Sequence, residues 1–129
     1  MAYRVLLVER NRLMIEQLAQ VIAQAGDNFQ LVARYQAPSD ALGQGVLFKP
    51  NLILLDIDGQ NGVSLITEFC KVYPEASILC LSERWQADGV SQLVQAGAKG
   101  YLVKPFTAEE LQAAVKAFAK SGMEVSSKV

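Results

Sequence analysis

Several apolar segments of this 129-residue sequence end in side chains that could take part in chemistry. In chain order, these side chains are Glu9 with Arg10, Asp56 with Asp58, Ser82, and Lys104. A carboxylate can act as a nucleophile toward a phosphoryl group. A lysine can neutralise phosphoryl oxygens, a hydroxyl can hydrogen-bond to one of them, and carboxylate oxygens can hold Mg²⁺. The set predicts a site for phosphoryl chemistry, provided that the fold brings the segment ends together.

A simpler interpretation is that polar residues end strands because strands end at the protein surface. That interpretation explains any one of these residues, but it explains four segment ends together less well. Asp56 follows the wholly apolar run 52–55. Burying a charge is costly unless the charge is paired or bound to a metal. We therefore expect Asp56 to be the centre of a charged cluster that includes both acids and bases.

The elements that would position this cluster alternate along the chain. Apolar runs at 3–8, 29–35, 52–55, 77–81 and 101–103 are typical of buried parallel strands. A segment with helical spacing of apolar residues follows each run. The expected inner faces are Met14, Leu18, Val21, Ile22 and Ala25; Leu42 and Val46; Leu65, Ile66, Phe69 and Tyr73; Val90, Leu93 and Val94; and Leu111, Ala114, Val115 and Phe118. Thr107 and Glu110 form a capping box before the last helix.

Five strand-then-helix units predict an α/β fold in which a parallel sheet carries helices on both faces. Right-handed crossovers limit the topology to a few choices. We predict the flavodoxin-like (βα)5 three-layer sandwich with sheet order 2-1-3-4-5. In such sheets the functional crevice lies outside the carboxyl ends of the strands, at the switch point between the first and third strands.

Length and composition indicate one domain, which we place at residues 1–121, followed by a polar tail or linker stub at 122–129. The net charge of −1 argues against direct nucleic-acid binding by this domain. No apolar run is long enough to span a membrane, and the N-terminus lacks the features of a signal peptide, so we expect a cytoplasmic protein. The chain has no histidine, and its cysteines, Cys70 and Cys80, lack metal-site spacing and are expected to be buried free thiols.

The sequence resembles the response regulator receiver family of two-component systems, in the manner of the chemotaxis regulators, over essentially its whole length. The segments that carry the resemblance are 8–10 (VER), 54–56 (LLD), 61–62 (NG), 81–82 (LS), 96–98 (AGA) and 100–107 (GYLVKPFT). The last of these, a strand that ends in Lys-Pro-Phe before a capped helix, is the most specific.

The resemblance implies that Asp56 is the phosphoacceptor, with Ser82 and Lys104 as its partners, and that the Lys104–Pro105 peptide bond is cis, which is physically inexpensive before proline. It also implies a switch in which Tyr101 turns inward when the Ser82 hydroxyl moves toward the phosphoryl group. The implied output surface consists of the fourth helix, the fifth strand and the fifth helix. Trp85, just after Ser82, would be a fluorescent probe of this switch.

The resemblance also implies partners and an absence of enzymatic turnover. A sensor histidine kinase or a phosphotransfer protein would supply the phosphoryl group, and a downstream output protein or domain would read the switched surface. A homodimer through that surface is an open alternative. The domain would not be an enzyme, beyond accepting a phosphoryl group from a donor and removing it from itself.

Two departures from the family pattern affect the expected Mg²⁺ site. Receivers usually carry two adjacent acids after the first strand, but here the positions hold Glu9 and Arg10. The loop after Asp56 is also shorter by two residues and lacks proline. One unit charge at 4 Å is worth about 4 kcal/mol at an effective dielectric of 20. We therefore expect Glu9, Asp56 and Asp58 to bind Mg²⁺ weakly or not at all, with Arg10 reaching a carboxylate in its place.

Two alternatives to a phosphorylation-controlled receiver remain open. The first is a pseudo-receiver, an interaction module that works without phosphorylation. The second, more remote, is a haloacid-dehalogenase-like phosphatase. It rests on the Asp56-Ile57-Asp58-Gly59 segment, in which Asp56 would be the nucleophile and Asp58 the acid. That motif normally lies on the first strand, whereas here it lies in mid-chain.

Overall fold

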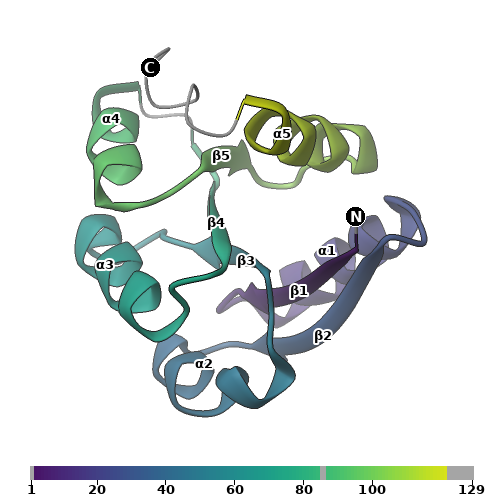
Figure 1. The fold of residues 1–129 in the computed structure, drawn as a ribbon, viewed down its shortest axis with the longest axis horizontal. Helices are drawn as coiled ribbons and strands as arrows, with labels where there is room; N and C mark the ends of the chain where they lie inside the picture. The colour runs from purple at the N-terminus through teal and green to yellow at the C-terminus, as the bar shows by residue number, and fades with distance from the viewer. Residues whose placement is uncertain (1, 85–86, 122–129) are drawn as a thin grey trace.

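The computed structural model describes residues 2–84 and 87–121, and strands and helices alternate along it (Figure 1). The strands are β1 (Tyr3–Val8), β2 (Phe29–Tyr35), β3 (Leu52–Asp56), β4 (Ser77–Ser82) and β5 (Gly100–Val103). The helices are α1 (Arg12–Gln24), α2 (Pro38–Gln44), α3 (Gly62–Val72), α4 (Ala87–Ala96) and α5 (Ala108–Ser121), with the short 3₁₀ helix η1 (Gly45–Phe48) after α2. Trp85 and the tail at 122–129 lie outside the described residues.

The strands form one parallel sheet in the order β2-β1-β3-β4-β5, which confirms the predicted flavodoxin-like topology. The register aligns the carboxyl ends of the central strands. Val8 pairs with Leu55, and Asp56 pairs with Leu81. Side chains that follow β1, β3, β4 and β5 therefore project from the same edge of the sheet, with β1 and β3 adjacent at its switch point.

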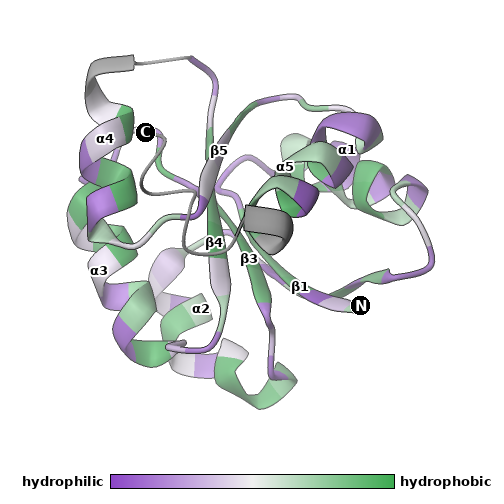
Figure 2. Ribbon diagram, turned by 45° about the horizontal axis from the view of Figure 1, so that its top comes forward, coloured by the Kyte–Doolittle hydropathy of each residue, from purple (hydrophilic) through white to green (hydrophobic). Residues whose placement is uncertain are grey.

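Helices cover both faces of the sheet, and the apolar strands lie between them (Figures 1 and 2). The helices α1 and α5 pack on one face through Ile15, Leu18, Ile22, Leu111, Val115 and Phe118. The helices α2, α3 and α4 pack on the other face through Ala41, Leu65, Ile66, Phe69 and Leu93. Strand β3 is buried along its whole length because both faces of the sheet are covered. Asp56 is thus held at the end of the most enclosed strand.

Side-chain caps begin three of the helices close to the strand ends. Asn11 and Asn61 cap α1 and α3 by accepting a hydrogen bond from a backbone N–H of the first turn. Thr107 Oγ1 accepts from the N–H of Glu110 at 3.0 Å, and Glu110 Oε1 accepts from the N–H of Thr107 at 2.9 Å. The predicted capping box is therefore present, and it fixes where the chain turns after β5.

One residue of the predicted helix faces is placed wrongly, and one inward residue was not predicted. Val46 is exposed because the α-helix ends at Gln44 and the chain continues as η1, which rotates that position out of the inner face. Gly45 faces the core there, where a side chain would overlap Tyr73 and Leu6. On α1, Met14 packs against the core as predicted, and Ile15, which was not predicted to face inward, is buried beside it in the sequence.

In the described part of the chain, no helix is both long and apolar enough to cross a bilayer. Both cysteines are free thiols. Cys80 is buried as predicted, whereas Cys70 is only partly buried. Burial raises the pKa of the Cys80 thiol to about 12, so this side chain stays protonated and acts as a small apolar group.

Candidate functional site

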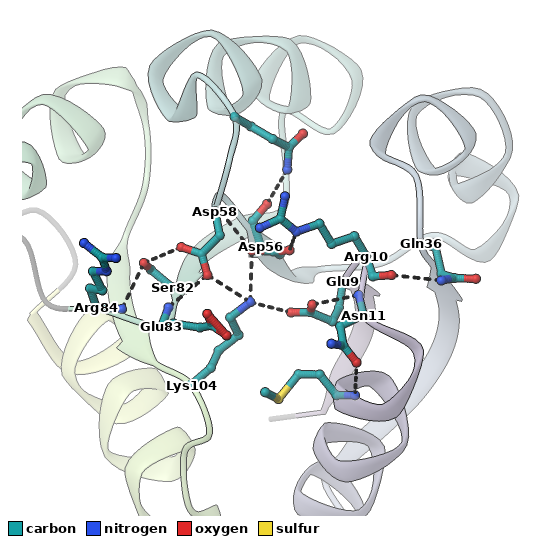
Figure 3. Close-up of polar contacts among 12 residues, drawn as sticks. Glu9, Arg10, Asn11, Gln36, Asp56, Asp58, Ser82, Glu83, Arg84 and Lys104 are labelled. Atoms are coloured by element: carbon teal, nitrogen blue, oxygen red, sulfur yellow. Dashed lines mark hydrogen bonds and ion pairs between the residues drawn. The ribbon is translucent and has the colours of Figure 1, made fainter.

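The predicted charged residues meet at the carboxyl edge of the sheet, and Lys104 is their common centre (Figure 3). Its Nζ lies 2.7 Å from Glu9 Oε1, 3.0 Å from Asp56 Oδ1 and 3.2 Å from Asp58 Oδ2. The ammonium group has three protons to donate, so each carboxylate has a donor. The peptide bond between Lys104 and Pro105 is cis, as the resemblance implied.

Asp56 is almost completely buried, with 1% of its side chain exposed, and its two carboxylate oxygens differ. Oδ1 accepts hydrogen bonds from Lys104 Nζ at 3.0 Å and from the backbone N–H of Asp58 at 2.9 Å. Oδ2 has no hydrogen-bond partner, and it is the only such buried side-chain oxygen or nitrogen among the side chains that the structure describes. The Asp56 side chain therefore presents one oxygen that accepts two hydrogen bonds and one oxygen that accepts none.

Arg10, which follows β1, faces Oδ2 of Asp56, the oxygen that accepts no hydrogen bond. Its Nε lies 3.7 Å from Asp56 Oδ2, which is an ion pair but too long for a hydrogen bond. The arginine side chain is 57% exposed, so solvent screens this attraction. Gly59 makes the approach feasible, because a side chain at that position would overlap the guanidinium group. The Arg10 carbonyl is in turn held by Gln36 Nε2 at 2.9 Å.

Asp58 points inward from the loop that follows β3. Its Oδ1 accepts from Ser82 Oγ at 2.6 Å, and its Oδ2 accepts from the backbone N–H of Glu83 at 2.9 Å. The short loop turns the side chain inward because Gly59 adopts a φ of 71° and Gln60 Nε2 donates to the Asp56 carbonyl at 3.0 Å. The hydroxyl of Ser82, predicted to serve Asp56, is thus bound to Asp58.

Burial and hydrogen bonding shift the pKa values of the cluster in different directions. Burial raises the pKa of Glu9 despite its hydrogen bond with Lys104. Burial opposes ionisation of Asp58 too, but donation from Ser82, Glu83 and Lys104 outweighs it and leaves the pKa of Asp58 below its ordinary value. Burial alone would lower the pKa of Lys104, yet its hydrogen bonds to Glu9 and Asp56 raise it, so the ammonium form is retained.

Tyr101 connects the site to the surface formed by α4, β5 and α5. Its hydroxyl donates to the Arg84 carbonyl at 2.6 Å, two residues beyond Ser82. Its ring is partly buried and packs against the core beneath α3 and α4. The chain from Ser82 to Arg84 is therefore held at one end by Asp58 and at the other by Tyr101.

Sequence reasoning missed several groups that build the site. The backbone N–H of Glu83 could not be foreseen from residue type. Asn11 donates its N–H to Glu9 Oε2 at 3.0 Å, and its place before an apolar helical pattern is a recognisable cap signal. No signal pointed to Gln60. Among the described residues, no group of three or more His, Cys, Asp or Glu side chains is arranged to hold a metal ion.

Comparisons with known proteins agree with this architecture. Residues 5–116 match the family described as the response regulator receiver domain. The chemotaxis protein CheY of Thermotoga maritima is 32% identical over 108 residues, which cover 82% of this chain and 88% of CheY. The transcriptional regulatory protein DegU of Brevibacillus brevis is 28% identical over 128 residues, which cover 98% of this chain. The chain spans only 54% of the length of DegU.

Two solved structures illustrate the shared fold. The isolated REC domain of RcsB from Salmonella enterica serovar Typhimurium, with the phosphomimetic BeF3⁻, has a TM-score of 0.80 and 15% identity, covering 93% of this chain and 90% of that chain. A chain of the CheX–CheY–BeF3–Mg²⁺ complex from Borrelia burgdorferi has a TM-score of 0.78 and 18% identity, covering 91% of this chain and 89% of that chain. Because the family match extends over most of the sequence, the chain belongs to the response regulator receiver domain family of two-component systems.

Proposed function

We propose that Asp56 accepts a phosphoryl group and that this modification changes the α4-β5-α5 surface for partner binding. The observation that carries the proposal is Asp56 Oδ2, a buried carboxylate oxygen that lacks a hydrogen-bond partner in the described residues. It lies on a side chain whose other oxygen is held by Lys104. A nucleophile fixed in this way, beside a cation that can neutralise new negative charge, suits phosphoryl transfer.

In the proposed transfer, Asp56 Oδ2 forms a bond to phosphorus while the bond between phosphorus and the donor breaks. The electron pair of that bond leaves with the donor, for example as acetate when the donor is acetyl phosphate. Lys104 neutralises charge on the transferred group, and the Ser82 hydroxyl hydrogen-bonds to it. Reaction with water would return the carboxylate and release phosphate. Any turnover is limited to this cycle.

Receiver domains in general bind Mg²⁺ at their acidic pocket, but the side chains of this chain do not fit that ion well. The carboxylates of Glu9, Asp56 and Asp58 are directed at Lys104 Nζ, while Arg10 faces the remaining oxygen of Asp56. Three carboxylates and two cations leave a formal charge of −1. We therefore propose that Mg²⁺ binds weakly or not at all, and no step of the proposed transfer depends on it.

The proposed partners follow from the family. A sensor histidine kinase or a phosphotransfer protein supplies the phosphoryl group, since this chain has no histidine of its own. A downstream protein, or an output domain such as the one that the greater length of DegU would accommodate, reads the α4-β5-α5 surface. A homodimer through the same surface stays a hypothesis, as do the cytoplasmic location and the assignment of 122–129 as a tail.

A phosphorylation-independent interaction module is the second candidate function. It is favoured by the ion pair between Arg10 and Asp56 and by the hydrogen bond that Ser82 donates to Asp58. The phosphatase alternative has less support. Its proposed acid, Asp58, accepts hydrogen bonds from Ser82 and Glu83, and hydrogen bonding of this kind favours the ionised form.

Acetyl phosphate treatment with and without Mg²⁺, followed by intact-mass spectrometry, tests the proposed function. One added phosphoryl group is expected on the wild type and none on Asp56→Asn. A phosphoryl group that persists in Asp56→Asn would refute the assignment of Asp56. If no phosphoryl group is added to the wild type or to the pocket variants Asp58→Ala and Arg10→Asp, the result would favour the phosphorylation-independent module. Turnover of a phosphomonoester would favour the phosphatase.

A further inference from the structure

The carboxylate of Asp58 is bound by three donors that come from separate parts of the chain. These donors, here called the three-donor cluster, are Ser82 Oγ at 2.6 Å, the Glu83 N–H at 2.9 Å and Lys104 Nζ at 3.2 Å (Figure 3). A hydroxyl, a backbone N–H and an ammonium group directed at one anion form an oxyanion-binding arrangement. In the unmodified domain, the anion in that arrangement is Asp58.

A phosphoryl group on Asp56 would need the same donors. Lys104 Nζ already contacts Asp56 Oδ1 and Asp58 Oδ2 together, so the two carboxylates share one ammonium group. A phosphoryl group carries about −1.5 to −2 charges at pH 7 and three strong acceptor oxygens. Attached to Asp56, it would compete with Asp58 for Lys104 and for the Ser82 hydroxyl.

The loop after β3 holds Asp58 in this position. The Asp58 N–H donates to Asp56 Oδ1 at 2.9 Å, and the positive φ of Gly59 turns the chain immediately afterwards. Only 19% of the Asp58 side chain is exposed. Both oxygens of its carboxylate are held by donors of the cluster, Oδ1 by Ser82 Oγ and Oδ2 by the Glu83 N–H and Lys104 Nζ. An anion therefore occupies the three-donor cluster whether or not Asp56 is modified.

We propose that Asp58 is a resident surrogate for the phosphoryl group. It holds Ser82, Glu83 and Lys104 as a phosphoryl group on Asp56 would, and it competes with that group for them. The inference rests on the proposed function of Asp56 and adds a regulatory role for the neighbouring acid. Arg84 follows Glu83, and its carbonyl accepts a hydrogen bond from the hydroxyl of Tyr101 on β5. The contacts that Asp58 makes with Ser82 and Glu83 are therefore connected through the backbone to the α4-β5-α5 surface.

The test compares the wild type with Asp58→Ala and with Asp58→Asn, a nearly isosteric variant that removes the charge. Asp27→Ala serves as a matched control, because Asp27 is exposed in the turn before β2, at the opposite edge of the sheet. Circular dichroism first establishes that each variant is folded. The rate of phosphorylation by acetyl phosphate is then measured by intact mass, and backbone amide shifts of Ser82, Glu83 and Tyr101 are followed by NMR as beryllofluoride is added.

Both Asp58 variants are expected to accept a phosphoryl group at least tenfold faster than the wild type and Asp27→Ala. In Asp58→Ala, the amide shifts of Ser82 and Glu83 should differ from the wild type at rest and return toward wild-type values with beryllofluoride. Equal rates and equal beryllofluoride responses in all four proteins would overturn the surrogate role while leaving phosphoacceptance by Asp56 intact. If neither the wild type nor either Asp58 variant accepts a phosphoryl group, the proposed function is overturned together with the surrogate role. If the wild type accepts one and the Asp58 variants do not, only the surrogate role is overturned.

Discussion

Lys104 Nζ lies 2.7 Å from Glu9 Oε1, although the two residues are 95 positions apart in the sequence. Both side chains are buried, and the same ammonium group also contacts Asp56 and Asp58. Lys104 is therefore the single internal cation that holds three carboxylates together at the end of the sheet, in the part of the chain that the structure describes. The consequence is structural as well as chemical, because removal of the lysine leaves these carboxylates without their shared partner.

Replacement of Lys104 by methionine should destabilise the domain by about 3–5 kcal/mol at pH 7, since breaking a buried ion pair leaves an uncompensated charge. A lysine at the end of a strand would ordinarily contribute little to folding, so the expectation arises from the three contacts. Urea denaturation measures the loss. Lys99→Met is the control, because Lys99 is exposed and its loss should change stability by under about 0.5 kcal/mol. Equal stabilities of the two variants would contradict the structural role.

Alkaline pH should reveal the same interaction. Burial opposes the charge on Lys104, but its hydrogen bonds to Glu9 and Asp56 raise its pKa above the ordinary value of 10.5. Protonated Lys104 therefore contributes its full stabilisation below pH 10.5, and this is lost as the pH rises through the folded-state pKa. The difference in unfolding free energy between wild type and Lys104→Met should shrink above that pH. If the difference in unfolding free energy stays constant up to pH 12, protonated Lys104 does not stabilise the fold through these contacts.

Gly59 should be required for the approach of Arg10 to Asp56. Alanine at this position would adopt an unfavourable positive φ, at a cost of about 1–3 kcal/mol, and would also overlap the guanidinium group. The Arg10→Ala change should relieve only the overlap, so a double-mutant cycle should show a coupling of about 0.5 kcal/mol or more. Gly43→Ala is the control, because Gly43 lies in α2 with open space around it and should gain stability. Strict additivity would mean that Arg10 does not occupy the space over Gly59.

Tyr101→Phe should loosen the segment after β4 without disrupting the core. It removes the hydrogen bond from the tyrosine hydroxyl to the Arg84 carbonyl, worth about 0.5–1.5 kcal/mol. Amide exchange at Glu83 and Arg84 should accelerate. Tyr73→Phe is a matched control, since Tyr73 donates to the Ala41 carbonyl in the other part of the same core. If both variants affect Glu83 and Arg84 alike, Tyr101 has no special connection to the site.

The sequence was sufficient to predict the fold because its signals were redundant. Alternating strand and helix patterns defined the sheet, and the wholly apolar run before Asp56 located its centre. Local context set the limits. Val46 was placed inward by helical spacing, but the α-helix ends at Gln44, and Gly45 takes the inward position close to Tyr73 and Leu6. Residue spacing cannot report such a change of helix type.

The site was predicted as a set of residues rather than as a set of pairs. The strand ends indicated that Asp56, Ser82 and Lys104 would lie close together. The pairing of Ser82 with Asp58 depends on the backbone of a five-residue loop and on a side-chain bond from Gln60. Neither the loop backbone nor the hydrogen bond from Gln60 has a distinctive sequence signal. The orientation of a carboxylate within a hydrogen-bonded turn is a property of the folded loop.

Arg10 provides the sharpest test of how this pocket treats a metal ion. The positive charge of its guanidinium opposes the binding of Mg²⁺. Its Nε lies 3.7 Å from Asp56 Oδ2, the oxygen that has no hydrogen-bond partner among the described residues. Arg10→Asp removes this cation and restores a second acid beside Glu9. We expect Mg²⁺ to bind at least tenfold more tightly to the variant, which corresponds to about 1.4 kcal/mol.

Amide NMR shifts of Asp56 and Asp58 during a Mg²⁺ titration provide the measurement. Arg12→Asp carries the same change in charge at the exposed first position of α1, and so measures the general effect of a more negative surface. That control should change the Mg²⁺ affinity by much less than tenfold, because water and salt screen the charge of an exposed side chain. Equal affinities in wild type and Arg10→Asp would show that the exposed guanidinium leaves Asp56 accessible. The capture of the three carboxylates by Lys104 would then be the feature that governs metal binding.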